Sequence, residues 1–457
     1  MGLNFYAPGG PTPLERTLAS AIIVAAFFGT QLWKRTDDFG FLPVVLVVYS
    51  MMFAIPIFTL LNFASVEEKL MPSGAALDEA LALSLLGLVC ILIAYFGTAR
   101  LRLPQVAMAW PDLVAVRWVS SLSALFGLGV FIVTRNLASS DATQAFINLP
   151  SEFLFLGVIA LFLLQLNGRL SVGFAALLWM VLIPVRFVIG MAQGEFALGF
   201  WVLMGLVIAY TTVRRRFPWI IFAAAVAAFL VLQPVKGRMR KMVFIAGGLN
   251  TEMSQSDKIQ SLSDTVFTGM ALLQALGPVE TVSLATQRLN DIVLFAGLIG
   301  YTPEDVPYWG SETYKPFVTR FIPRFLYPEK PLETPGNDYG HKYGMLNPSD
   351  YITSVNVPQL NELYGNFGPW AVPLGCLLIG FLYRVVNNLF VDGGLGAYVT
   401  AIYVFSGIVD IENTAASRFG AIPLHLATAL LFAATIHLFS AFRRAVYAHS
   451  AGLTRRA

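Results

Sequence analysis

The chain has 457 residues, of which 56% are hydrophobic and 12% are charged, and its formal net charge is +3. Soluble domains carry about 25% charged residues, so the composition excludes a soluble globular protein and predicts a polytopic membrane protein. The small net charge gives no support to binding of nucleic acid. Both cysteines, Cys90 and Cys376, fall in apolar segments, so no disulfide framework is expected.

The apolar segments predict an all-α membrane protein. A spanning helix needs about 20 mostly apolar residues, and the chain contains about eleven such segments with no internal repeat. Pro56 and Pro184 interrupt two of them, which membrane helices tolerate. The predicted spans are 17–33, 41–63, 79–98, 117–134, 151–167, 170–192, 196–213, 217–235, 368–391, 395–412 and 421–441.

The Lys and Arg residues of the short loops predict the orientation. Apart from the long segment 236–367, one set of alternate loops carries fourteen cations, counting Arg384, and the opposite set carries four, counting Arg418. The C-terminus is therefore predicted to be cytoplasmic, with the N-terminus and the long segment outside. Three parts result: spans 1 to 8 over 1–235, an outer segment over 236–367, and spans 9 to 11 with a basic tail over 368–457.

The outer segment is predicted to lie on the bilayer and not to form a separate domain. Residues 262–286 mix apolar and small polar residues, as in one or two short amphipathic helices. Residues 291–300 are apolar but too short to span, so we expect them to pack into the same layer. The irregular stretch 301–360 is long enough to predict a functional loop, and its many aromatic residues argue against disorder.

Two basic clusters stand out in the outer segment. Residues 320–331 combine three cations with three prolines. Because proline fixes φ and lacks a backbone donor, this is predicted to be a stiff loop, which suggests an anionic ligand held in a defined pose. Residues 236–241 carry four cations directly after the eighth span, on the outer side. Either a span is miscounted there, or these cations bind an anion at the outer leaflet.

Four motifs occur in order: the cluster 236–241, Arg-Leu-Asn at 288–290, Phe-Ile-Pro-Arg-Phe-Leu-Tyr-Pro-Glu-Lys-Pro at 321–331, and Asn-Glu-Leu-Tyr-Gly-Asn-Phe-Gly at 361–368. Over about 236–370 the chain thus resembles the oligosaccharide repeat unit polymerases, the Wzy-type O-antigen polymerases of bacterial surface polysaccharide pathways. The resemblance implies a GT-C-like helical fold in the bacterial inner membrane. It also implies an enzyme that joins repeat units carried on undecaprenyl pyrophosphate at the outer face.

The implied partners are the lipid-linked glycan donor and acceptor, membrane lipid, a flippase and a chain-length regulator, with no cofactor. Cations would stabilise the charge that grows on the pyrophosphate leaving group. Arg186, inside the sixth span, could serve the same purpose or form a structural ion pair with Glu195, Asp410 or Glu412. The candidate pyrophosphate ligands are Arg186, Arg238, Arg240, Arg288, Arg320, Arg324 and Lys330.

A general base would activate the acceptor hydroxyl. Glu362, within the motif at 361–368, is the first candidate, followed by His341, Asp338 and Asp350. The alternative for Glu362 is a structural role, either capping a helix start or pairing with a motif arginine. The outer segment has no Cys and one His, so the sequence does not support a metal site.

Two other functions remain open. An O-antigen ligase would use the same donor with another acceptor, which the sequence does not display. A transporter or flippase of lipid-linked oligosaccharide should show an internal repeat and polar features at mid-membrane in both halves. The single outer insertion and the absence of a repeat favour an enzyme that works on one face.

Overall fold

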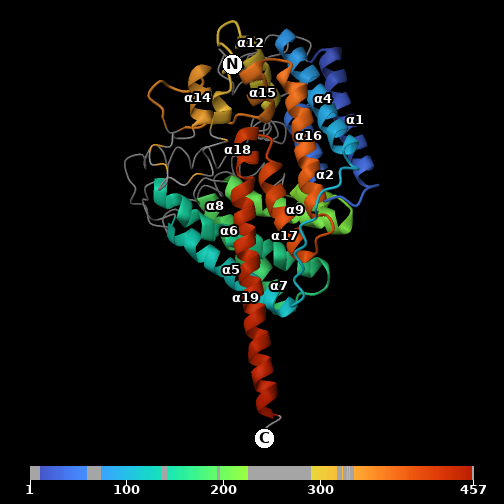
Figure 1. Ribbon diagram of the computed structural model, residues 1–457. Coiled ribbons are helices and arrows are strands. Elements are labelled where there is room, and N and C mark those ends of the chain that lie inside the picture. The colour runs from blue at the N-terminus through green and yellow to red at the C-terminus, as the bar shows by residue number, and fades with distance from the viewer. Residues whose placement is uncertain are drawn as a thin grey trace, which may run out of the picture.

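The computed structural model describes residues 11–58, 74–134, 141–192, 196–224, 290–315, 317, 322, 327, 329, 334–351 and 353–454. These residues form helices, turns and loops, and no strand occurs among them. The all-α prediction is therefore confirmed for this part of the chain. Figure 1 shows the helices gathered into one body, from which the C-terminal helix projects at the end opposite the N-terminus.

Among the described residues, five helices are long and apolar enough to cross a membrane. Each coincides with a predicted span, because long runs of apolar residues favour a helix whose backbone groups bond to one another. They are α1 (Pro13–Trp33), α4 (Gly74–Gly97), α5 (Leu113–Thr134), α16 (Ala371–Phe390) and α19 (Ile422–Thr454), the last taken together with α18 (Ala415–Gly420).

Most of the other predicted spans contain shorter or interrupted apolar stretches, such as 151–166 within α6 and 202–214 within α9, and most of span 217–235 lies outside the described residues. Span 41–63 breaks at Ala54, just before Pro56, whose nitrogen cannot continue the helical hydrogen bonds. In span 170–192, a π-helical turn over Leu177–Leu182 separates two α-helices. These elements are α2 (Phe41–Phe53), α3 (Ile55–Phe58), α6 (Asp141–Leu166), α7 (Val172–Ala176), α8 (Ile183–Ala192), α9 (Phe196–Arg214) and α17 (Leu395–Ile408).

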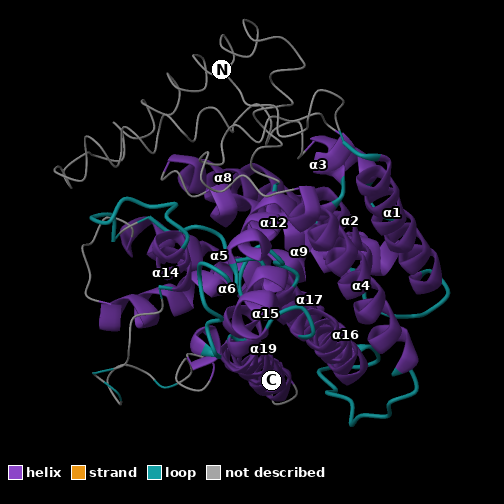
Figure 2. Ribbon diagram, turned by 90° about the horizontal axis from the view of Figure 1, so that it is seen from above, coloured by secondary structure: helices purple, strands orange, loops and turns teal. Residues whose placement is uncertain are grey.

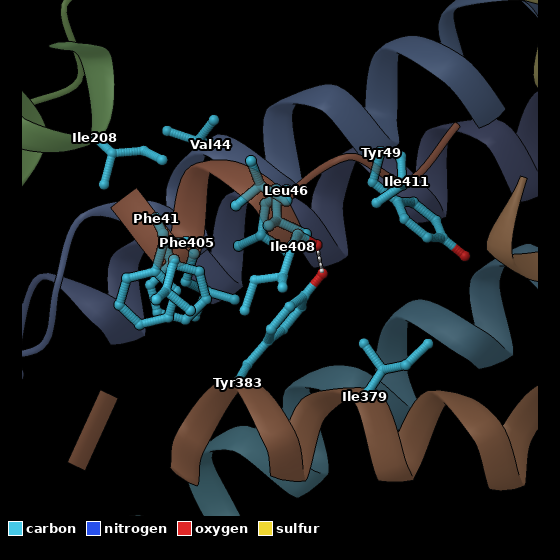
Figure 3. Close-up of a cluster of buried hydrophobic side chains, with 14 of the residues drawn as sticks. Phe41, Val44, Leu46, Tyr49, Ile208, Ile379, Tyr383, Phe405, Ile408 and Ile411 are labelled. Carbon is cyan, nitrogen blue, oxygen red and sulfur yellow. Dashed lines mark hydrogen bonds between the residues drawn. The ribbon is translucent and has the colours of Figure 1, made fainter. Parts of the chain in front are cut away.

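The core forms where α2, α16 and α17 meet, while α4 packs along α16 and α5 along α6. Figure 3 shows the stacked rings of Phe41 and Phe405, whose centroids are 3.8 Å apart. The buried Tyr383 hydroxyl donates a hydrogen bond to the Ile408 carbonyl at 3.1 Å. This bond satisfies the one polar atom that the aromatic ring brings into an apolar core.

Arg384 lies within α16 and not in a loop, which corrects its place in the charge count. It forms an ion pair with Asp38 at 2.6 Å, and each side chain is only 7% exposed. Asn387 donates to the same carboxylate at 2.8 Å. A buried charge needs such partners, so Arg384 belongs to the packing of the helices and does not count as a loop cation that sets the orientation.

At the end of the body opposite the C-terminus lie α12 (Asp291–Tyr301), α14 (Pro335–Lys342) and α15 (Gln359–Phe367), as Figures 1 and 2 show. The expectation that 291–300 packs instead of spanning is confirmed, since α12 is buried along most of its length. Three aromatic residues of 301–360 form a buried cluster: the ring of Trp309 lies 5.8 Å from that of Tyr339 and 6.2 Å from that of Tyr343. The helices predicted over 262–286 lie outside the described residues.

Candidate functional site

A polar cavity of about 190 Å³ is lined by residues of α6, α8, α9, α17, α18 and α19. Segments from both halves of the chain contribute to it. Its lining is rich in charged and hydrogen-bonding groups, although it is built from apolar helices. The polar residues of the lining are Ser151, Glu152, Arg186, Tyr403, Ser406, Arg418 and His425.

Three of these residues form a connected row. The Tyr403 hydroxyl of α17 donates a hydrogen bond to Glu152 Oε2 of α6 at 3.1 Å. The Tyr403 ring also lies 4.9 Å, centroid to centroid, from the imidazole of His425 in α19. Gly407 allows this approach, because a Cβ atom there would lie 2.6 Å from His425 Cε1. A carboxylate, a phenol and an imidazole therefore face the cavity together.

Arg186 brings a cation to the same wall. Its guanidinium lies 3.5 Å from the centroid of the Phe131 ring in α5, within the range of a cation–π interaction. It also attracts Glu152 electrostatically. The π-helical turn before α8 shifts the rotation of the residues that follow, and such turns are frequent at functional sites. A charge that is costly in an apolar segment is thus compensated by a ring, a carboxylate and a cavity.

Arg418 supplies the second cation, from the short helix α18. It forms an ion pair with Asp410, whose carboxylate also accepts hydrogen bonds from Asn413 at 2.7 Å and from the backbone of Glu412 at 3.1 Å. Asp410 holds the arginine in place while 26% of the Arg418 side chain stays exposed. Asp410, proposed from the sequence as a partner of Arg186, therefore pairs with a different arginine.

This arrangement can bind an anion and accept a proton. Arginine guanidinium groups match phosphate oxygens with two parallel hydrogen bonds, and two of them line one cavity. Glu152, oriented by Tyr403, is a carboxylate placed within reach of a ligand in that cavity. The cavity volume suits a group of pyrophosphate size better than a whole oligosaccharide, since sites for larger ligands measure about 300–1,000 Å³.

Glu362, the first candidate base from the sequence, lies in α15 and caps the start of another helix, and its role as a base stays a prediction. Its side chain is fully buried, and its Oε2 accepts hydrogen bonds from the backbone nitrogens of Ala415, at 2.5 Å, and Ala416, at 3.3 Å. These nitrogens begin α18 and have no partner within that helix. Of the roles that the sequence left open, capping a helix start is the one the geometry supports.

The surroundings of Glu362 also explain its motif. Burial raises the pKa of Glu362 to about 7, against the lowering effect of the Thr313 hydroxyl and the two backbone donors. Gly365 lies against the Trp309 ring, where a Cβ atom would come within 2.7 Å of ring carbons. Gly368 has a φ of +81° and ends α15. The motif at 361–368 is therefore a packing element that joins α15, α18 and the loop before α14.

His341 and Asp338 lie on α14 and do not belong to the cavity lining. His341 Nε2 is 2.9 Å from the Asp350 carbonyl oxygen, and its ring lies against Tyr351. Asp338 is exposed and accepts a hydrogen bond from the Thr334 hydroxyl at 3.3 Å. Asp338 thus lies at the surface and His341 is half-buried, and neither lines the cavity.

Most of the predicted pyrophosphate ligands cannot be located, because they lie outside the described residues. Arg186 is the one that the structure describes, and it does line a cavity. Glu195, proposed as its partner, also lies outside the described ranges. The remaining candidates outside these ranges are Arg238, Arg240, Arg288, Arg320, Arg324 and Lys330.

The sequence analysis did not identify Glu152 or Tyr403 as site residues, and it did not predict that Arg418 and His425 line the same cavity. A signal was available for Glu152, since an acid at the start of a predicted span carries the same cost in lipid as Arg186. Tyr403 and His425 carried none, because aromatic and imidazole groups in apolar helices are common. Over the part of the chain that the structure describes, no group of three or more His, Cys, Asp or Glu residues could hold a metal ion.

Comparison with known proteins gives limited help. No curated protein matches the chain, and no solved structure matches it. Residues 194–413 match the model of a family described as a domain of unknown function, DUF8712. This range begins just before α9 and ends after α17, so it contains Tyr403 and Ser406 of the cavity lining but not Glu152, Arg186, Arg418 or His425.

Proposed function

We propose that the protein is a lipid-pyrophosphate-dependent glycosyltransferase that polymerises oligosaccharide repeat units, as its motifs over 236–370 suggest. The observation that carries the proposal is the meeting of two arginines with an oriented carboxylate around one cavity of an apolar helical protein. A leaving pyrophosphate needs the arginines, and an attacking sugar hydroxyl needs the carboxylate. Both requirements of the reaction are met within one site.

In the proposed step, a hydroxyl oxygen of the acceptor glycan attacks the anomeric carbon of the donor glycan. The bond from that carbon to the phosphate oxygen breaks, and undecaprenyl pyrophosphate leaves with the bonding electron pair. The hydroxyl proton passes to the Glu152 carboxylate, which Tyr403 orients. Arg186 and Arg418 stabilise the negative charge on the leaving group, and each well-placed donor of this kind contributes about 3–4 kcal/mol in comparable sites.

The proposal includes a topology. The eleven predicted segments would cross the bacterial inner membrane in a GT-C-like arrangement, with the N-terminus outside and the C-terminus cytoplasmic. Val202 lies in the first half of α9, Tyr403 in the second half of α17, and His425 in the first turn of α19. Under this topology each of these positions belongs to the outer half of its helix, so the cavity would face the side on which carrier lipids present glycans.

The test uses a deletion strain and its own lipid-linked oligosaccharide. Deletion is expected to leave single-repeat surface glycan and no polymer, and wild-type protein supplied in trans is expected to restore the polymer. The repeat unit on its carrier, extracted from the deletion strain, then serves as substrate for purified protein in liposomes. We expect a ladder of carrier-linked oligomers from that single substrate.

Each other outcome identifies a different function. Polymer that accumulates on its carrier without reaching its final acceptor would overturn the polymerase and indicate an O-antigen ligase. Lipid-linked units trapped in the inner leaflet would overturn both enzymes and indicate a flippase. Surface glycan that is unchanged by the deletion would exclude all three functions.

A further inference from the structure

A second, apolar groove of about 750 Å³ lies on the opposite side of α2 from the core, between α1, α2 and residues 216–222. Its walls are almost wholly hydrocarbon, with Phe27 and Trp219 both more than 60% exposed. None of its lining residues belongs to the polar cavity. It is therefore a separate feature, which the proposed glycosyl transfer does not use.

Cations line one end of this groove. Lys34 follows the last residue of α1, and Arg216 follows α9 by two residues. Both side chains are exposed, and within the described ranges neither takes part in an ion pair. The Lys34 ammonium donates a hydrogen bond to the neutral side-chain amide oxygen of Gln31 at 3.4 Å. This end of the groove therefore carries two cations that form no ion pair among the described residues, while the nearby Asp37 acts electrostatically on Arg215.

The adjacent Arg215, by contrast, is held by hydrogen bonds within the protein. Its guanidinium donates hydrogen bonds to the backbone oxygens of Trp33, Thr36 and Asp38 and lies 4.0 Å from the centroid of the Trp33 ring. Arg215 thus ties the end of α1 to the end of α9 beside the groove. Because Arg215 is already satisfied, Lys34 and Arg216 are the cations available to a ligand.

The dimensions match one leaflet of a bilayer. Along α1 the lining runs from Ile23 to Lys34, which is twelve residues, or about 16 Å from the first Cα to the last. Half of the hydrocarbon core of a membrane is about 15 Å thick. The exposed Trp219 lies three residues from Arg216, as tryptophan does at membrane interfaces. The groove therefore extends from an interface to about the midplane.

From this geometry we propose that the groove binds one phospholipid with an anionic headgroup. The headgroup phosphate lies between Lys34 and Arg216, and an acyl chain runs along α1 and α2 toward Ile23 and Met51. A zwitterionic lipid would present a choline or ethanolamine cation to the same two side chains and is disfavoured. The site belongs to the leaflet in which the α1 C-terminus lies, whichever side of the membrane that is.

The first experiment measures lipid binding to purified full-length protein in detergent by native mass spectrometry. Phosphatidylglycerol is expected to bind in a one-to-one complex that phosphatidylcholine does not form. The double variant Lys34→Ala, Arg216→Ala loses the electrostatic attraction of two cations to the anionic headgroup. We therefore expect it to bind phosphatidylglycerol roughly 30-fold more weakly. The matched control, Arg35→Ala with Arg102→Ala, removes the same charge from exposed positions outside the groove and should keep the complex.

A second experiment locates the acyl chain. Phosphatidylglycerol with a photoreactive group in its acyl chain should label peptides that contain Phe27 or Met51. Val47→Trp, which fills the groove from α2, should reduce this labelling while the unfolding temperature stays within a few degrees of wild type. The proposal would be overturned if both double variants lost phosphatidylglycerol equally, or if the protein bound both lipids equally. It would also be overturned if no peptide of the groove were labelled, which would indicate that the chain itself fills the groove.

Discussion

The Tyr403 hydroxyl donates its hydrogen to Glu152 Oε2 at 3.1 Å, which joins α17 to α6 between residues 251 positions apart in the sequence. The bond holds one carboxylate oxygen and leaves the group facing a cavity that two arginines also line. It makes Glu152 the best-placed base among the described residues. It also means that the carboxylate and its orienting phenol can be changed separately.

Glu152→Gln should abolish most of the polymerase activity. The amide oxygen still accepts the hydrogen bond from Tyr403, but the amide cannot take the acceptor proton. General base catalysis contributes about 10²–10⁴-fold, so we expect at least a 100-fold lower rate of ladder formation at equal protein level. Tyr403→Phe, which removes only one orienting hydrogen bond of about 1 kcal/mol, should lower the rate less than tenfold. Full activity of the Gln variant would remove Glu152 from the mechanism.

Arg418→Lys should lower the rate of transfer while the protein stays folded. The ammonium keeps the charge and the attraction to Asp410 but loses the two-pronged donor that a phosphate requires. Loss of a donor to the leaving group costs about 10²–10³ in rate. Arg443→Lys is the matched control, because Arg443 also pairs with an aspartate, Asp112, but lies outside the cavity. If both variants polymerise at the same rate, Arg418 does not act on the pyrophosphate.

Glu362→Gln should change the pH dependence of stability and not the chemistry. The pKa of Glu362 in the folded protein is about 7, above its ordinary value of 4.5, because the carboxyl is buried. The folded state then binds more protons than the unfolded state between these values, so wild-type stability falls relative to the Gln variant as pH rises from about 4.5 to about 7. Unfolding temperatures of both proteins at pH 4.5 and pH 8 measure this difference. A difference that is constant with pH would contradict the raised pKa.

Gly365→Ala should destabilise the folded protein by about 1–3 kcal/mol, because the new Cβ overpacks α15 against the Trp309 ring. Trp309→Phe in the same protein should recover part of this loss, because the smaller ring vacates the space that the new Cβ needs. Gly129→Ala in α5 is the control, since its Cβ meets nothing within 4 Å and should be neutral or slightly stabilising. Thermal unfolding in detergent compares the variants, and equal effects at Gly365 and Gly129 would contradict the packing argument.

Arg384→Met should cost about 3–5 kcal/mol, because it leaves the Asp38 carboxylate buried without its cation. Adding Asp38→Asn should restore much of the stability. The exposed pair of Lys342 and Glu312 provides the contrast, and Lys342→Ala should cost less than about 1 kcal/mol, since water replaces the lost partner. Similar losses at the two pairs would show that burial does not decide the strength of the ion pair near Asp38.

Local pattern predicted the helices well where it was strong. Long, mostly apolar runs at α4 and α16 became long helices, and the short apolar run at α12 was predicted to be too short to span. Pattern failed for α15, which lies at the start of a motif rich in polar residues and is nevertheless buried along nearly its whole length. Some of its polar groups bond to distant partners: the Asn361 amide nitrogen, for example, donates to the Tyr339 hydroxyl at 3.2 Å.

The sequence by itself determined the class of the protein, because composition and the length of apolar runs measure how a chain divides between lipid and water. It also identified Arg186 as a charge that needs an explanation. Only the tertiary structure decided which groups lie near the Arg186 guanidinium and which backbone nitrogens Glu362 binds. Glu152, Tyr403, Arg418 and His425 come from four helices, and a cavity between helices depends on how they cross. Glu362 became a cap because its folding partner, the start of α18, lies more than fifty residues away.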